Sequence, residues 1–248
     1  MSETCIVIPA RFKSSRFPGK PLINLLGKSM IIRVAELANK ILERKDIYIA
    51  TDNEQIKKEV LDNGFQCIKT EKNALTGTDR VAIASEKLNY KFFINIQGDE
   101  PLIDPKDIQK CIEIKKEFPE YVINGYCYIG EDEPLNSKNI PKLLIDKKDN
   151  LLYISRAIIP AQKNFKKNIK NIYKKQVCIY AFTRKELKIF YNYGSKTELE
   201  EVEDIEILRF LELGMRVKMF KCKKGSLAID VPSDVKKVEE ALNKKIHN

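Results

Sequence analysis

The sequence predicts an α/β fold in which a mixed, mostly parallel sheet carries helices on both faces. Short apolar runs alternate with segments of helical periodicity through the first half of the chain, which is the pattern of βαβ units. No internal repeat and no linker divides the 248 residues. We therefore expect a single domain, residues 1–248, with a small inserted hairpin arm that spans about residues 130–175.

The first half contains four predicted strands, each followed by a predicted helix. The strands are the apolar runs at 5–10 (CIVIPA), 46–51 (DIYIAT), 65–70 (FQCIKT) and 92–97 (FFINIQ). Apolar residues at helical spacing predict helices over 29–44, 53–62, 78–88 and 105–118. Asn63-Gly64 is a typical helix end. This alternation favours right-handed crossovers between neighbouring parallel strands.

The second half is less regular. Residues 122–129 (VINGYCYI), 176–182 (QVCIYAF) and 215–222 (MRVKMFKC) are predicted strands, and 227–230 (LAID) is a short one. Residues 141–155 predict a hairpin that turns at 147–150. A helix is expected after residue 182, a long acidic helix over 202–213, and a last helix over 233–244.

Charge and composition narrow the class of protein. The net charge is +10, but lysines are spread along the whole chain, and no basic segment is interleaved with stacking aromatics, so nucleic-acid binding is a minor hypothesis. Six separated cysteines and one histidine do not suit a zinc site and indicate a reducing compartment. No apolar run is long enough to span a membrane or to serve as a signal peptide. We therefore expect a cytoplasmic protein.

Four cations follow the first predicted strand, in the segment IPARFKSSRFPGKPL at residues 8–22. In an open α/β sheet, ligands bind outside the carboxyl ends of the strands. QGDEP (97–101) follows the fourth strand, Asp230 follows the last short one, and TGTDR (76–80) precedes a helix. The cations are Arg11, Lys13, Arg16 and Lys20.

These features fit a magnesium-bound nucleoside triphosphate. Arginine, lysine and backbone amides neutralise phosphate charge, and Asp99 with Asp230 could hold Mg²⁺, which prefers one or two carboxylates with phosphate and water. Other interpretations stay open: a solvated cationic loop, Asp99 as a turn residue, Asp230 as a helix cap, and Thr78 as a cap. The loop does not match GxxxxGK[ST], which excludes a Walker-type phosphate loop.

Taken together, the motifs resemble one family. IPARFKSSRFPGKPL, TGTDR, NIQGDEPL, YISRAIIP, IYAF and AIDVPSDV stand here in the order seen in 3-deoxy-manno-octulosonate (KDO) cytidylyltransferases, the CMP-KDO synthetases. The resemblance covers about residues 6–242. It implies a Rossmann-like nucleotide-diphospho-sugar transferase fold, a homodimer, and Mg²⁺ as cofactor. The implied reaction joins CTP and an acidic 2-keto-3-deoxy sugar into a CMP-sugar and releases pyrophosphate.

The resemblance also implies roles for individual residues. Arg16 and Lys20 would hold the triphosphate and act in catalysis together with the proposed metal ligands Asp99 and Asp230. The other nucleotide-binding positions would be Ala10, Arg11, Thr76, Gly77 and Arg80. The sugar-facing positions would be Gln97, Arg156, Gln176, Tyr180 and Glu206.

Two departures from the family pattern fall on the sugar side. Gln176 stands where the family has His, and Ile207 stands where it has Gln. Gln can replace His as a neutral partner but cannot become a cation. Either these are neutral exchanges, or the acceptor is a KDO variant such as its 8-amino form. The alternatives are a CMP-nonulosonate synthetase and, in a different class, a basic RNA-binding protein with a degenerate nucleotide fold.

Overall fold

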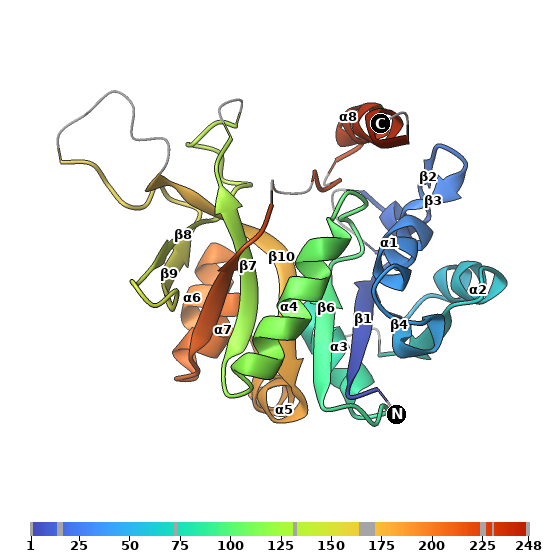
Figure 1. Cartoon of the computed structure of the whole chain (residues 1–248), viewed down its shortest axis with the longest axis horizontal. Coiled ribbons are helices and arrows are strands. Elements are labelled where there is room, and N and C mark those ends of the chain that lie inside the picture. The colour runs from blue at the N-terminus through green and yellow to red at the C-terminus, as the bar shows by residue number, and fades with distance from the viewer. Residues whose placement is uncertain are drawn as a thin grey trace.

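The protein is described here from a computed structural model. The structure describes residues 2–13, 17–71, 74–130, 133–163, 172–223, 227–229 and 231–246. Its centre is a nine-stranded sheet (Figure 1). The strands of its main path, in spatial order, are β11 (Val217–Lys221), β7 (Val122–Tyr128), β10 (Lys174–Thr183), β6 (Phe92–Ile96), β1 (Thr4–Ala10), β4 (Ile47–Thr51) and β5 (Gln66–Lys69).

The sheet is mixed and mostly parallel, as predicted. β1 pairs in parallel with β4 and β6, β4 with β5, and β11 with β7, whereas β10 runs antiparallel between β6 and β7. All residues of β1 and β6 are buried. Unbroken apolar runs of this kind are typical of parallel strands that are covered on both faces.

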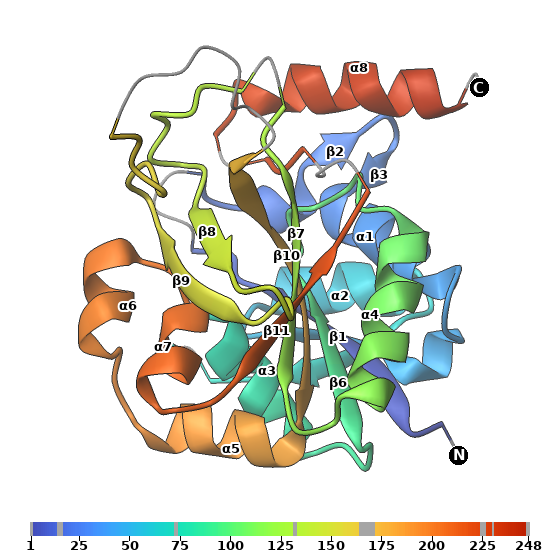
Figure 2. The same cartoon turned by 60° about the vertical axis from the view of Figure 1, so that its left-hand side comes forward.

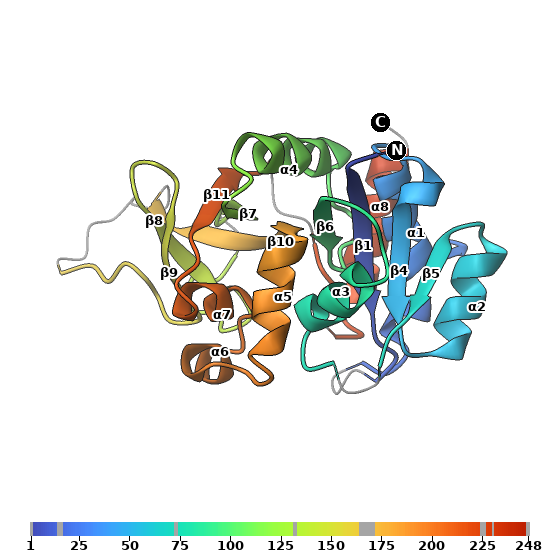
Figure 3. The same cartoon turned by 90° about the horizontal axis from the view of Figure 1, so that it is seen from below.

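Helices cover the two faces of the sheet separately (Figure 3). One face carries α1 (Met30–Asn39), α2 (Glu54–Asp62) and α4 (Pro105–Glu117), and a cluster of buried aliphatic side chains lies beneath them. The other face carries α3 (Gly77–Ser85), α5 (Arg184–Asn192), α6 (Glu198–Glu203) and α7 (Ile207–Glu212), over a second cluster rich in aromatic rings. Two single turns of 3₁₀ helix are η1 (Lys20–Leu22) and η2 (Arg44–Asp46).

The predicted acidic helix over 202–213 is wrong. The chain forms two short helices instead, because Asp204 takes a left-handed conformation (φ 50°, ψ 51°) at the end of α6. Asp tolerates this region better than most residues. The carbonyls of Glu203 and Asp204 both accept hydrogen bonds from the Arg156 guanidinium, at 2.5 and 2.9 Å. A distant side chain therefore holds the break.

Three smaller expectations also differ from the structure. The helix after residue 28 ends at Asn39 rather than residue 44, and residues 227–229 form no strand. Thr76, not Thr78, caps α3, because the helix begins one residue before the predicted start. A small hairpin of two-residue strands, β2 (Asn24–Leu25) and β3 (Lys28–Ser29), was not predicted.

The predicted hairpin at 141–155 is present as β8 (Lys142–Ile145) and β9 (Leu151–Ser155). β8 also pairs with the start of β10, which joins the arm to the main sheet. The turn reaches the edge strand β11: the Asp149 carbonyl accepts from the Met219 amide at 2.7 Å. The arm thus covers part of an open sheet edge, which would otherwise offer unpaired backbone groups to other chains.

The last helix, α8 (Asp234–Ile246), lies across one end of the molecule above β2 and β3 (Figure 2). It encloses a third apolar cluster with Leu25, Met30 and Ile229, against which Phe17 packs. This cluster ties the segment after β1 to the segment that precedes position 230. In the described part of the chain, no helix has both the length and the apolar character that a membrane span requires.

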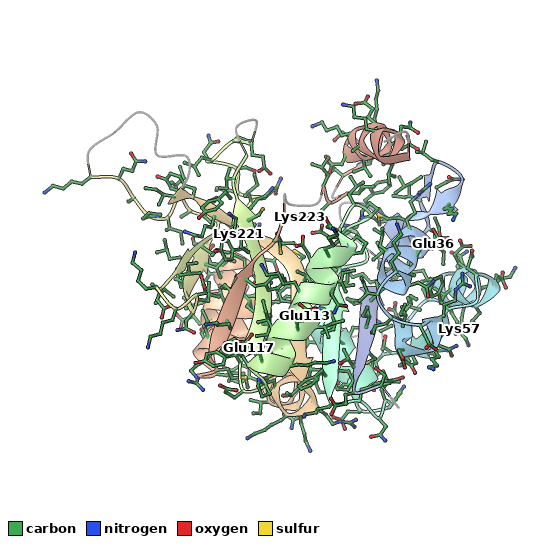
Figure 4. The ribbon with its side chains drawn as sticks, in the orientation of Figure 1. Glu36, Lys57, Glu113, Glu117, Lys221 and Lys223 are labelled. Atoms are coloured by element: carbon green, nitrogen blue, oxygen red, sulfur yellow. The ribbon has the colours of Figure 1, made fainter. Side chains whose placement is uncertain are left out.

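Charged side chains of both signs share the outer surface (Figure 4). Glu113 and Glu117 on α4 are exposed, as are the nearby Lys221 and Lys223. Lys28 and Glu36 pair at 2.5 Å. Because acids and bases alternate over these helices, the excess of lysine forms solvated faces, as predicted from its even spread along the sequence.

Candidate active site

A pocket of about 270 Å³ opens at the carboxyl ends of β1 and β6. Its wall comes mainly from the loop after β1, the loop after β6, the start of α3 and the α6–α7 turn, and Met30 of α1 and Lys196 before α6 complete it. The polar lining residues among the described part of the chain are Arg11, Lys20, Thr76, Arg80, Gln97, Asp99, Lys196, Glu200, Asp204 and Glu206. Ala10 and Gly77, two predicted nucleotide-binding positions, also line it.

Lys20 joins three of the predicted motifs in one place. Its ammonium group donates to the Asp99 carboxylate at 2.6 Å and to the Ile229 carbonyl at 2.8 Å. The Ile229 amide in turn donates to the Asp99 carbonyl at 3.1 Å. The cationic loop, the QGDEP loop and the segment that leads to position 230 therefore meet at this edge of the sheet. Arg16 and Asp230 themselves lie outside the described residues.

Two glycines let these loops approach closely. Gly19 has φ 73°, and its amide closes the loop by donating to the Phe12 carbonyl at 2.9 Å. A Cβ on Gly98 would lie 3.0 Å from the Pro9 carbonyl oxygen and 3.1 Å from Ile31 Cδ1. Any larger residue would have to push the loop that carries Asp99 a few tenths of an ångström away from the backbone of β1, so glycine favours this close approach.

The start of α3 is fixed from two directions. Thr76 and Asp79 form a capping box, in which the Thr76 hydroxyl accepts from the Asp79 amide and Asp79 accepts from the Thr76 amide. From outside, the Glu206 carboxylate accepts from the Gly77 amide (3.0 Å), the Thr78 amide (2.9 Å) and the Thr78 hydroxyl (2.5 Å). An anion is favourable at a helix N-terminus. Burial nevertheless raises the pKa of Glu206 above its ordinary value.

Behind this wall, a buried charge cluster links α3, α6 and α7. The Arg209 guanidinium is fully buried, donates to Asp79 at 2.8 Å and to Glu200 at 2.5 and 2.7 Å, and lies 3.8 Å from the centre of the Phe190 ring. Because Asp79 belongs to the capping box and Glu200 lines the pocket, Arg209 holds two parts of the pocket wall in register.

Arg80 is the buried cation of the pocket, with 3% of its surface exposed. Its guanidinium contacts the Thr70 hydroxyl and the Glu71 carbonyl, and lies 3.8 Å from the Asp52 carboxylate. Burial lowers its pKa, and Asp52 offsets part of that effect. Arg11, by contrast, is an exposed residue at the rim.

The residues predicted to face a sugar divide into two groups. Gln97 and Glu206 line the pocket. Tyr180 is buried behind it and stacks on Phe182, and burial raises its pKa well above the ordinary value. The Arg156 guanidinium donates to backbone carbonyls of the α6–α7 turn and of Lys138. Gln176 donates to Asn124 at 2.9 Å.

Of the α6–α7 contribution to the wall, the sequence pointed to Glu206 but not to the other residues. Lys196 pairs with Asp204 at 2.9 Å, and with Glu200 and Ile205 these residues line the pocket. Lys196 was not predicted because the sequence around it contains no motif that distinguishes it from the other lysines of the chain. The left-handed Asp204, which turns the chain here, is not a glycine and so gave no turn signal.

Among the described residues, no group of three His, Cys, Asp or Glu side chains is arranged to hold a metal ion. Two oxygen atoms at the edge of the pocket nevertheless face a cation, because the Asp99 carboxylate and the Ile229 carbonyl both accept from the Lys20 ammonium. Oxygen donors of this kind suit Mg²⁺ when phosphate and water complete the shell. The donor set at Asp99 therefore fits that ion.

The fold and the pocket define an α/β nucleotidyltransferase, in which the carboxyl edge of a mixed sheet presents cations, backbone amides and a carboxylate to a ligand. A solved structure of a CMP:2-keto-3-deoxy-manno-octonic acid synthetase complexed with CTP is similar to this chain, with a TM-score of 0.89 and 31% identity, over 98% of this chain and 100% of that one. A cytidylyltransferase from Leptospira borgpetersenii matches with a TM-score of 0.65 and 14% identity, which supports the fold alone.

Sequence relatives agree. A family model described as Cytidylyltransferase matches residues 5–218. A 3-deoxy-manno-octulosonate cytidylyltransferase of Escherichia coli is 32% identical over 99% of this chain and 98% of its own. An 8-amino-3,8-dideoxy-manno-octulosonate cytidylyltransferase of Shewanella oneidensis is 38% identical over 96% of this chain and 97% of its own. The chain belongs to the cytidylyltransferase family, a family of enzymes.

Proposed function

We propose that this enzyme transfers CMP from CTP to the anomeric 2-hydroxyl of KDO or of its 8-amino form and releases pyrophosphate. The observation that carries the proposal is the junction of Lys20, Asp99 and Ile229, because it brings three sequence motifs of the family to one edge of the pocket. The relatives named for these two acceptors match almost the whole chain.

The chemistry we infer is an in-line displacement at the α-phosphorus. The acceptor hydroxyl oxygen forms a bond to the α-phosphorus and releases its proton to water, while the bond from that phosphorus to the bridging oxygen of the β-phosphate breaks and pyrophosphate leaves. Such reactions depend on positioning and on neutralising the charge of the phosphates. Arg11, Lys20 and Arg80 line the pocket as cations for this role, and Arg16 is proposed to join them. The backbone near Ala10, Thr76 and Gly77 is proposed to hold the nucleotide.

We infer that Mg²⁺ is the cofactor and that Asp99 and Asp230 are its protein ligands. When bound, the ion would neutralise phosphate charge. Lys20 would then exchange its contact with Asp99 for one with a phosphate oxygen, which lies within the reach of a flexible lysine side chain. On the acceptor side, Gln97 and Glu206 line the pocket and are the proposed contacts of the sugar. Direct roles for Arg156, Gln176 and Tyr180 remain predictions.

We infer that the enzyme acts as a homodimer in the cytoplasm. Large apolar side chains are exposed on and around the β8–β9 arm: Leu152 (59%), Ile158 (41%), Ile172 (42%) and Tyr128 (39%). Several exposed large apolar groups on the arm and the segments beside it favour an interface there. Light scattering after size-exclusion chromatography measures the mass, and Leu152→Lys should shift a dimer toward monomers.

Pyrophosphate release tests the activity. The protein is incubated with Mg²⁺, each of the four nucleoside triphosphates, and a panel of acid sugars that contains KDO, its 8-amino form and a nonulosonate. We expect release with CTP and an octulosonate. Turnover with a nonulosonate alone would favour the CMP-nonulosonate synthetase, and no turnover with any sugar would reject the proposed acceptor class. Asp99→Asn serves as the inactive control.

A further inference from the structure

Strand β10 contains a bulge next to the pocket. Its pairing with β7 jumps from Val177 opposite Gly125 to Tyr180 opposite Asn124, so β10 advances three residues where β7 advances one. Cys178 and Ile179 are the extra residues. Bulges of this kind bend a strand and redirect its side chains, and they are common near active sites.

A single buried side chain holds this bulge. Asn124 has no exposed surface, and its Nδ2 donates to the Val177 carbonyl at 3.0 Å and to the Ile179 carbonyl at 2.9 Å. Its Oδ1 accepts from Gln176 Nε2 at 2.9 Å. Asn124 thus supplies hydrogen bonds to the two carbonyls that flank Cys178 in the bulge, as buried backbone groups require.

The neighbouring residue makes room for the bulge. A Cβ on Gly125 would lie 2.7 Å from Ile179 Cγ2 and 2.7 Å from Cys222 Sγ. The side chain of Ile179 therefore packs directly on the bare backbone of β7. Asn124 and Gly125 act as a pair: one satisfies the bulged carbonyls and the other leaves space for the bulged side chain.

The bulge connects directly to the pocket. The Cys178 carbonyl accepts from the Gln97 amide at 3.4 Å, and Gln97 lines the pocket two residues before Asp99. A Cβ on Gly77 would lie 2.9 Å from Gln97 Nε2, so the Gln97 side chain in turn lies against the start of α3. The position of the bulge thus affects the position of Gln97, a proposed contact of the acceptor sugar.

We propose that Asn124 is a positioning residue that fixes the acceptor wall of the pocket through the β10 bulge, with Gln176 as its partner. The inference rests on the proposed function for the identity of the acceptor. In this proposal Gln176 belongs to the internal network around the bulge. The exchange of the family's histidine for Gln176 therefore affects how the pocket wall is supported. Neither side chain needs to touch the substrate.

Steady-state kinetics test the role. Asn124→Ala should raise the KM for the octulosonate about tenfold, as expected for the loss of buried hydrogen bonds, and leave the KM for CTP within about twofold. Gln176→Ala, which removes one of the three bonds, should shift the same constant less, and the double variant should resemble Asn124→Ala because the two groups share one network. Asn53→Ala removes the cap of α2, far from the bulge, and should move neither KM.

The proposal is overturned if Asn124→Ala raises both KM values equally, or raises neither. A second measurement does not depend on the acceptor. Cys178 is half-buried in the bulge, and burial raises the pKa of its thiol well above the ordinary value, so it should react slowly with iodoacetamide. In Asn124→Ala, mass spectrometry should find Cys178 labelled about tenfold faster, with Cys5 and Cys111 still protected.

The two measurements separate the possible failures. Equal acceleration at all buried cysteines would indicate general unfolding, and unchanged labelling of Cys178 would show that Asn124 does not hold the bulge; either result overturns the proposal. Cys67 on β5 is the half-buried reference thiol, whose rate should not change. If the wild-type protein turns over no acid sugar, the proposed function fails, and labelling of Cys178 still decides whether Asn124 fixes the bulge.

Discussion

The two sides of the pocket are built in different ways. On the β1–β6 side (residues 9–13, 17–21 and 97–99), backbone lies against backbone at Gly98, whose missing side chain allows the close contact with Pro9. On the β10–α7 side (residues 176–180 and 196–209), side chains such as Asn124, Arg156 and Arg209 hold a bulge, a left-handed turn and two short helices in place.

The two sides should therefore differ in the amino-acid substitutions that they tolerate. Contacts between backbones depend on a few small residues and tolerate little substitution. Networks of side chains can be exchanged in groups, provided that every buried polar atom keeps a partner. The β1–β6 side is therefore suited to a constant ligand such as a nucleotide, and the β10–α7 side is suited to discriminate among acceptors.

The largest effect is expected from the carboxylate at the centre of the β1–β6 side. Asp99→Asn removes the charge that pairs with Lys20 and that is proposed to bind the metal. Pyrophosphate release should fall about 10²- to 10³-fold, the loss seen when one electrostatic group is removed from a transition state. The melting temperature should change little, since Asp99 is only part-buried. Asp62→Asn, exposed at the end of α2, is the matched control; equal activity of the two variants would refute the role of Asp99.

On the β10–α7 side, the largest effect should appear in stability. Arg209→Met leaves Asp79 and Glu200 buried without their cation, which should lower the free energy of unfolding by about 3–5 kcal/mol. Arg216 also stacks on a ring, that of Tyr121, but is 62% exposed in its ion pair with Glu120. Arg216→Met should lower the free energy of unfolding by less than about 1 kcal/mol. Urea unfolding measures both, and similar losses would show that the buried cluster contributes no more than a surface pair.

Two glycines sharpen the comparison. In Gly98→Ala the new Cβ lies 3.0 Å from the Pro9 carbonyl oxygen of β1, so the loop that carries Asp99 must shift by a few tenths of an ångström. We expect kcat to fall about tenfold because the reacting groups are displaced. In Gly77→Ala the new Cβ meets the end of the Gln97 side chain, which can rotate away. Its effect should not exceed about threefold. Steady-state kinetics with CTP decide; a larger effect for Gly77→Ala would show that the Gln97 side chain is no freer to move than the Pro9 backbone.

The same division explains which features could be predicted from the sequence. The strands of the central sheet were predicted because each is an apolar run, and Lys20, Asp99 and Gly77 were predicted because they stand in short motifs next to those runs. Gly98 stands in the same motif as Asp99, and its contact with Pro9 follows from the parallel pairing of neighbouring strands. Local pattern is sufficient where backbone geometry builds the site.

The β10–α7 side was predicted less well, for a physical reason. The segment from Glu198 to Glu212 is rich in Glu and Leu, which are good helix formers. It breaks at Asp204, where Arg156, just after β9, donates to the carbonyls of Glu203 and Asp204. Gln176 turns toward Asn124, which is 52 residues away in the sequence. No window of sequence contains both members of such a pair, so the direction of these side chains follows only from the folded chain.

The smallest effect concerns pH and compares two carboxylates that each clamp a helix start. Burial raises the pKa of Glu206 at α3. Above its unfolded pKa of about 4.3, the native state holds this proton more tightly than the unfolded state, so the contribution of Glu206 to stability falls as the pH rises through the folded pKa. Glu212 accepts from the amides of Leu199 and Glu200 at the start of α6, and hydrogen bonds lower its pKa despite some burial.

Glu212 should therefore behave in the opposite way, and its contribution should be lost as the pH falls through its folded pKa. Urea unfolding of the wild type, Glu206→Gln and Glu212→Gln between about pH 4 and about pH 7 measures both contributions. As the pH rises, Glu206→Gln should gain stability relative to the wild type, and Glu212→Gln should lose it. Slopes of the same sign would mean that the half-buried carboxylate of Glu206 is no more desolvated than the exposed carboxylate of Glu212, and that the β10–α7 side excludes less water than its packing indicates.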